Sequence, residues 1–188
     1  MKTFLHYLLL CLAFEVAAVL GGPVAAAATL QVTAPSLDLS VGQTGGFGFS
    51  FTNDSRGFAV FNNSDLDQQS GGYGIYTDFI GTQPDLVIVA PEATISQIFD
   101  NAAQTGAGSY TFLPAANPGT TINGTLTIFY DTYSVSPNNP AFDSIADYLS
   151  SQSVSTNVNL VAVAAPEPTG WTLAAVGLIL IVLSRKYV

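Results

Sequence analysis

Short apolar runs separated by turn-forming residues dominate the middle of this 188-residue chain. The clearest run is Phe47-Gly-Phe-Ser-Phe51, in which every second residue is aromatic. Successive side chains of a β-strand point to opposite faces, so this spacing places the three Phe rings on one face. Clusters of Gly, Pro, Asn, Asp and Ser separate the runs, which is typical of short strands joined by turns. The chain is therefore expected to form an all-β fold, an antiparallel β-sandwich of the immunoglobulin-like kind.

Other segments continue the same pattern. Strands are predicted at Phe58–Phe61, Tyr73–Ile80, Asp85–Val89, Tyr110–Leu113, Thr121–Val135 and Val154–Val163. Residues 91–103 fit two structures. The Pro and Glu at the start suit the first turn of a helix. The β-branched residues and the surrounding strands favour a strand, and we expect a strand here. Residues 142–149 fit a connection with one or two helical turns.

The aromatic residues of these segments are expected to fill the core between two sheets. The core is predicted to contain Phe47, Phe49, Phe51, Phe58, Phe61, Phe79, Phe112 and Phe129. The tyrosines fit either half-buried packing positions, which are the commoner role, or a platform on which sugar rings stack. The tyrosines in question are Tyr73, Tyr76, Tyr110, Tyr130 and Tyr133.

The beginning of the chain has the features of a secretory signal peptide, predicted for residues 1–28. Lys2 supplies the positive charge, Leu8–Leu20 the apolar run, and Ala25–Ala28 the small residues before a cleavage site. The Sec export machinery is the expected partner of such a segment. The exported domain, or ectodomain, is predicted to span residues 29–164.

A second apolar stretch follows the ectodomain, at about residues 170–184. A helix that spans a bilayer needs about 20 apolar residues. This stretch is shorter, but snorkelling Arg185 and Lys186 extend its reach and Trp171 suits the opposite interface. These two basic residues are half of the four in the chain, and their position predicts a membrane helix with a cytoplasmic tail.

Pro166-Glu167-Pro168, the apolar stretch and the basic pair occur in this order over residues 165–188. Together they resemble the sorting signal of PEP-CTERM proteins, which are exported proteins of Gram-negative bacteria. The resemblance implies that an exosortase, a membrane-embedded enzyme similar to cysteine transpeptidases, reads and processes this tail. It also implies an inner-membrane intermediate with a periplasmic ectodomain, then a place on the cell surface or in a biofilm matrix rich in exopolysaccharide.

Two stretches of the ectodomain resemble domains that recur among the same proteins, namely Val41–Asn53 and Thr125–Pro137. That resemblance gives a hint of the fold, and it implies nothing about activity, because no activity is established for those domains. The Pro166-Glu167-Pro168 motif has the geometry expected of a recognition peptide. Each Pro disfavours helix in the residue before it and so keeps the segment extended.

Composition excludes several kinds of function. A net charge of −9 and a pI near 4.1 argue against binding nucleic acid, whose phosphates this surface would repel. Residues 29–168 contain no His, Cys, Met, Lys or Trp, so an active site would have to use carboxylates and hydroxyls. Two carboxylate pairs suit glycoside hydrolysis in spacing, Asp65 with Asp67 and Asp143 with Asp147, but both lie in polar surroundings where acids stay solvated. We therefore predict no catalytic residue.

Calcium is the cofactor for which the sequence offers ligands. Asn62, Asp65 and Asp67 supply oxygens within what looks like a loop at residues 62–67, although no Glu closes it in the EF-hand manner. Two functions follow from the sequence. The first is a non-enzymatic surface or matrix protein sorted by an exosortase. The alternative is a carbohydrate- or calcium-binding surface module that is simply anchored in the membrane.

Overall fold

The computed structural model describes residues 28–68 and 72–165, and over these ranges the chain is all-β, as predicted. Eleven strands are found there, whereas helices are absent from the described ranges. The strands are β1 (Thr29–Val32), β2 (Ser36–Ser40), β3 (Thr44–Phe47), β4 (Phe49–Thr52), β5 (Phe58–Gln68), β6 (Gly74–Asp78), β7 (Ile88–Val89), β8 (Thr94–Gln97), β9 (Gly108–Phe112), β10 (Thr121–Tyr133) and β11 (Tyr148–Val163).

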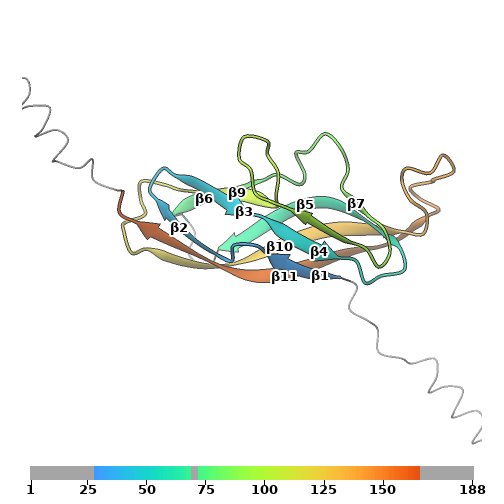
Figure 1. Ribbon diagram of the computed structural model, residues 1–188, viewed down its shortest axis with the longest axis horizontal. Helices are drawn as coiled ribbons and strands as arrows, with labels where there is room; N and C mark the ends of the chain where they lie inside the picture. Colours follow the sequence, from blue (N-terminus) through green and yellow to red (C-terminus); the bar gives the residue numbers. More distant parts are fainter. Residues whose placement is uncertain (1–27, 69–71, 166–188) are drawn as a thin grey trace, which may run out of the picture.

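The strands form two layers. One layer is a five-stranded sheet with the order β2-β11-β10-β5-β7. The other consists of two three-stranded sheets, β1-β4-β8 and β3-β9-β6, which meet where β3 continues through Gly48 into β4. The long strands β10 and β11 run along most of the molecule (Figure 1). Two layers allow each sheet to bury one face against the other, which is the arrangement of a β-sandwich.

The first and last parts of the ectodomain meet in the five-stranded sheet. Strand β2 pairs with the end of β11, from Ser36 opposite Asn159 to Ser40 opposite Val163. This ladder is parallel, whereas the other ladders between the described strands are antiparallel. The pairing makes β2 one edge of the five-stranded sheet.

The predicted row of Phe side chains forms the centre of the core. Phe47, Phe49 and Phe51 are fully buried, which confirms the alternation expected from the sequence. Phe51 packs edge-to-face against Phe61 of β5 and Tyr130 of β10, at centroid distances of 4.7 Å and 5.2 Å. Such aromatic pairs stabilise the contact between layers beyond the area they bury.

Phe129 departs from the predicted core. Its side chain is 37% exposed, because the even-numbered residues of β10 face the core and the odd-numbered ones face solvent. Phe58 is only half-buried at the start of β5. The remaining members of the predicted set, Phe61, Phe79 and Phe112, are buried as expected.

The segment that fitted either a helix or a strand contains a strand. Residues 94–97 form β8, and a turn at Pro91 and Glu92 precedes it, with Glu92 at a φ of 59°. The β-branched residues thus dominate over the helix-start signal of the Pro. In the 142–149 segment, the Asp147 N–H donates to Asp143 O across one isolated turn.

The prediction of a loop at residues 62–67 is wrong. These residues belong to β5, which continues to Gln68 and pairs with β10. Asn, Asp and Ser indicated a turn, but they alternate here between solvent and interior. Leu66 and Ser64 face inward, and Asp65 and Asp67 face outward.

Several predictions concern residues outside the described ranges. These are the signal peptide up to residue 27, the Pro166-Glu167-Pro168 motif, the apolar stretch at 170–184, and Arg185 with Lys186. Among the residues that are described, no helix is long and apolar enough to cross a membrane.

Candidate functional site

The outer face of strands β10 and β11 is the most distinctive exposed surface of the described chain. We define the polar strip as the outward side chains of these strands: the odd-numbered residues of 121–133 and of 151–161, together with Tyr148. Each residue of β10 in this set lies opposite one of β11, from Thr121 with Val161 to Tyr133 with Tyr148. Most members are Ser, Thr or Asn, and Asp131 is the only charged one.

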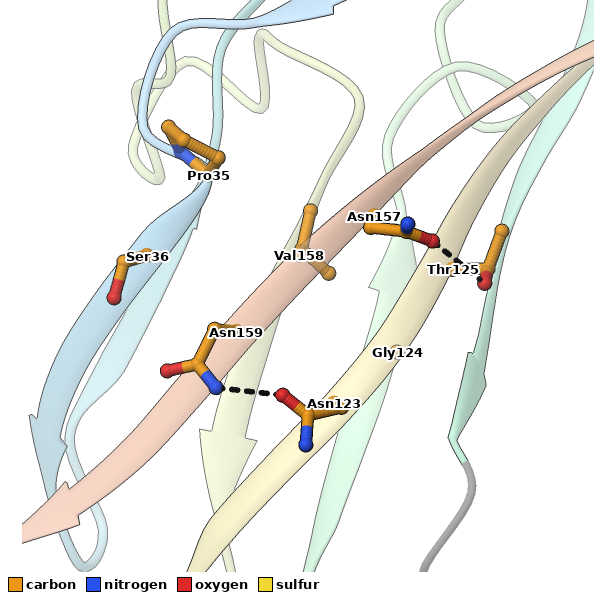
Figure 2. Close-up of a pocket in the computed structure, with 8 residues that line it drawn as sticks. All are labelled: Pro35, Ser36, Asn123, Gly124, Thr125, Asn157, Val158 and Asn159. Carbon is orange, nitrogen blue, oxygen red and sulfur yellow. Dashed lines mark hydrogen bonds between the residues drawn. The ribbon is translucent and has the colours of Figure 1, made fainter.

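A shallow hollow lies at one end of the polar strip, next to the start of β2 (Figure 2). Its volume is about 580 Å³. Asn159 Nδ2 donates to Asn123 Oδ1 at 2.8 Å, and Thr125 Oγ1 donates to Asn157 Oδ1 at 3.4 Å. These bonds hold the amide groups across the two strands, as the dashed lines in Figure 2 show. The lining is completed by Pro35, Ser36, Gly124 and Val158.

Aromatic side chains occupy the other half of the polar strip. The Tyr133 ring contacts Phe142 and Tyr148 edge-to-face, at centroid distances of 5.2 Å and 5.9 Å. Tyr148 is 43% exposed, and its hydroxyl lies 2.9 Å from Ser151 Oγ, which in turn donates to Asp131. Burial, with Asp131 as a second cause, raises the pKa of Tyr133 above its ordinary value.

The charges around the polar strip are negative. Asp65 and Asp67 of β5 lie opposite Thr127 and Thr125 of β10, and both face outward. Asp38 of β2 lies opposite Val161 and is exposed. Among the described residues, the only Lys or Arg is Arg56. The surroundings of the strip therefore repel anions.

The three calcium candidates are all exposed on β5. Asp65 and Asp67 share the outer face of β5, whereas Asn62 lies at a bulge where Phe129 and Tyr130 of β10 face Asn63 and Phe61. In the described part of the chain, no three His, Cys, Asp or Glu residues gather in a group that would hold a metal ion. A calcium site at these residues stays a prediction.

The second carboxylate pair stabilises a loop. Asp143 accepts the backbone N–H groups of Ala146 and Ile145, and these bonds lower its pKa. Asp147 accepts Ser134 Oγ–H and the Asp143 N–H. Both carboxylates thus shape the connection between β10 and β11, and neither lies in the apolar pocket that a general acid needs.

The five tyrosines proposed as a platform do not lie together. Tyr110 and Tyr130 are buried in the core, and Tyr76 is mostly buried beside β5. Of the proposed set, Tyr133 belongs to an exposed aromatic group, and its partners Phe142 and Tyr148 were not predicted. The sequence did carry a signal for the strip, namely the period-two polar pattern of residues 121–133, whose outward face ends in Phe129, Asp131 and Tyr133.

A buried polar cluster joins the two layers. Ser64 Oγ of β5 lies 2.6 Å from Asp78 Oδ1, 2.6 Å from Ala107 O and 2.7 Å from Tyr76 OH. Asp78 also accepts the N–H groups of Ile80 and Gly81. Burial raises the pKa of the Tyr76 hydroxyl above its ordinary value. Ser64 is only 4% exposed, so this cluster acts as a structural link between the layers and offers no access to a substrate.

Comparison with known proteins gives no family assignment. Scans against protein-family models and against curated proteins found no match. Among solved structures, a PapD-like domain of human CEP192 aligns at a TM-score of 0.31 and 12% identity, over 73% of this chain and 87% of that one. A family 123 glycoside hydrolase from Clostridium perfringens aligns at a TM-score of 0.31 and 9% identity, over 76% of this chain but only 28% of the hydrolase. Likeness at this level supports no functional argument.

Proposed function

We propose that this chain is an exported, non-enzymatic surface or matrix protein, whose immunoglobulin-like ectodomain is released or retained by an exosortase through the Pro166-Glu167-Pro168 motif. The proposal includes Sec-dependent export, a membrane-held intermediate with a periplasmic ectodomain, and a final place in an exopolysaccharide-rich layer. Arg185 and Lys186 would hold the tail on the cytoplasmic side until it is processed.

One observation carries this proposal. A signal-peptide pattern, a β-rich domain, the Pro-Glu-Pro motif, an apolar stretch and a basic pair follow one another in this order. The last strand ends at Val163, three residues before Pro166, so the motif directly follows the folded domain. A processing enzyme needs an extended segment outside the domain, and the two Pro residues favour extended geometry.

The non-enzymatic part of the proposal has separate support. Asp143 and Asp147 accept backbone N–H groups of their own loop, and Asp65 and Asp67 are exposed on a strand face. Neither pair lies in the apolar pocket that a general acid needs.

Mass spectrometry of the C-terminal peptide tests the proposal. The protein would be isolated from membrane and surface fractions of its native host, with and without the processing enzyme. We expect a C-terminus between residues 166 and 169 in the surface fraction, and its loss when the enzyme gene is deleted.

Substitutions in the motif sharpen this test. Pro166→Ala combined with Glu167→Gln is expected to leave the tail uncleaved, whereas Pro140→Ala in the β10–β11 loop serves as the matched control. An intact end at Arg185-Lys186 found only in membranes, in every strain, would show a plain anchored protein and contradict the proposal.

A further inference from the structure

We propose that the polar strip binds a neutral polysaccharide, laid along β10 and β11 from the hollow at Asn123 to the Tyr133–Tyr148 pair. This inference goes beyond the sorting proposal and does not depend on how the tail is processed. It commits the ectodomain to one ligand class, an uncharged chain of hydroxylated sugars.

The hydrogen-bonding groups of the strip match those of a sugar. Asn, Ser and Thr each donate and accept, as sugar hydroxyls do. The bonds within the strip use part of this capacity. Asn123 Oδ1 accepts from Asn159 Nδ2, so Asn123 Nδ2 and Asn159 Oδ1, on two residues that line the hollow, remain for a ligand (Figure 2). A bound chain would thus meet donors and acceptors that the neighbouring strands have already positioned.

Aromatic rings supply the apolar contact that a sugar ring needs. Phe129, at 37% exposed, is an apolar ring in the middle of a polar face, with Thr127 before it and Asp131 after it among the outward residues. Tyr148 lies further along the same face and is 43% exposed. The C–H face of a pyranose packs on such rings, while its hydroxyls reach the surrounding polar groups. The exposed Phe129 ring between polar residues distinguishes this strip from a sheet face that carries polar side chains alone.

Charge decides which polymer fits. Asp131 lies within the strip, and Asp38, Asp65 and Asp67 lie beside it. A polyanion such as DNA or an acidic glycan would be repelled along this whole length. A second copy of the chain fits less well for the same reason, because two identical acidic faces repel, and a protein interface needs a larger apolar centre. An uncharged polymer meets neither obstacle.

The length of the strip suits a chain better than a single sugar. Strand β10 has 13 residues, which at about 3.3 Å per residue extend for about 40 Å. Several consecutive sugar units would lie on it, each with few contacts. We therefore expect weak binding per unit and measurable binding of a long polymer through several contacts in sequence.

Affinity gel electrophoresis of the full-length chain in mild detergent tests the inference. The probes are laminarin, a neutral β-glucan, dextran, a neutral α-glucan, and alginate, a polyanion. We expect at least one neutral glucan to retard the protein, and alginate to have no effect. Phe129→Ala should weaken the retardation about fivefold, which is the size of one aromatic packing contact. Asn157→Ala should weaken it in the same direction.

Matched variants separate binding from folding. Thr94→Ala removes an exposed hydroxyl from the outer face of the opposite layer and should bind like the natural chain. Absence of retardation by both neutral glucans, or equal losses in Phe129→Ala and Thr94→Ala, would overturn the inference. Tail cleavage in the host is read separately, so this outcome would leave the sorting proposal standing.

Discussion

At the scale of single residues, Asn53 organises one end of the sandwich. Its side chain is fully buried, and its Nδ2 group lies within 2.8–3.1 Å of the carbonyl oxygens of Gly57, Val89 and Ala90. Its Oδ1 accepts the N–H and hydroxyl of Ser55. One side chain thus joins its own turn, through Gly57, to Val89 and Ala90, which lie 36 and 37 residues further along the chain.

Asn53→Ala is therefore expected to destabilise the protein strongly. The two amide hydrogens that serve the carbonyls of Gly57, Val89 and Ala90 would be lost, which costs about 3 kcal/mol in the free energy of unfolding. Urea denaturation measures this loss. Asn63→Ala is the matched control, because Asn63 is exposed on β5 and should cost less than about 0.5 kcal/mol. Similar losses in both variants would contradict the role assigned to Asn53.

Two neighbouring glycines of β3 show how little room the packing leaves. A Cβ on Gly46 would collide with the Phe99 ring and lie 2.5 Å from the backbone oxygen of Gly108. A Cβ on Gly45 would meet only the end of the Leu39 side chain. The clash at Gly46 involves backbone, which cannot move easily, whereas the clash at Gly45 involves only a flexible side chain.

Gly46→Ala should consequently cost more stability than Gly45→Ala, by about 2 kcal/mol, which is typical of overpacking in a core. Thermal unfolding of the two variants side by side measures the difference. A larger loss for Gly45→Ala would show that the strand position, and not the contact with Gly108, determines the cost.

At the scale of elements, β6 and β9 place Tyr rings over glycines of the opposite strand. A Cβ on Gly74 of β6 would collide with Tyr110, and one on Gly108 of β9 with Tyr76. The Tyr110 ring therefore covers the backbone at Gly74, and the Tyr76 ring covers the backbone at Gly108. The Tyr110 hydroxyl donates to Gln68 Oε1 at 3.2 Å, and burial raises the pKa of this Tyr to about 12.

This raised pKa predicts a loss of stability in alkali. The folded state holds the Tyr110 proton more tightly than the unfolded state, whose pKa is about 10. Its contribution to stability is complete below pH 10 and is lost as the pH rises to about 12. Urea denaturation between pH 9 and 12 measures the slope. Tyr110→Phe should show a shallower slope, and an unchanged slope would contradict this origin.

Strand β10 and strand β5 show how far the sequence alone can be read. The alternation of residues 121–133 and of Phe47, Phe49 and Phe51 predicted strands that the structure contains. The second half of β5 was missed, because its inward Ser64 is polar. That position tolerates a hydroxyl because two acceptors distant in sequence, Asp78 Oδ1 and Ala107 O, lie within hydrogen-bonding distance of its single O–H. Local pattern contains no information on such partners.

The polar strip was also predicted only in part, because it too depends on strand pairing between segments distant in sequence. Its residues on β10 were placed correctly on a strand, but half of the surface comes from β11. The sequence predicted only the second part of that strand, from Val154, whereas β11 begins at Tyr148. The Ser-rich segment 150–155 has low strand propensity by itself, and pairing with β10 overrides that preference.

At the scale of the whole molecule, the surface charge is almost entirely of one sign. The chain has 13 acidic and 4 basic residues, with a pI near 4.1. Repulsion between copies keeps such a protein soluble at neutral pH, and protonation of the carboxylates removes it.

We accordingly expect light scattering of the purified protein to rise as the pH falls from 7 and to be greatest near pH 4. Added salt at pH 7 should increase association, since it screens the repulsion. If scattering were greatest at neutral pH, charge repulsion would not be what limits association. Contact between apolar surfaces would then be its cause.

The pairing of β11 on both sides has a mechanical consequence. Over its last residues, β11 is bonded to β10 on one side and to β2 on the other. A pull applied at Val163 along the strand axis therefore loads both ladders in shear, so that many hydrogen bonds resist together instead of opening one after another. Whatever follows Val163 is attached to the domain at the point where its sheet best withstands tension.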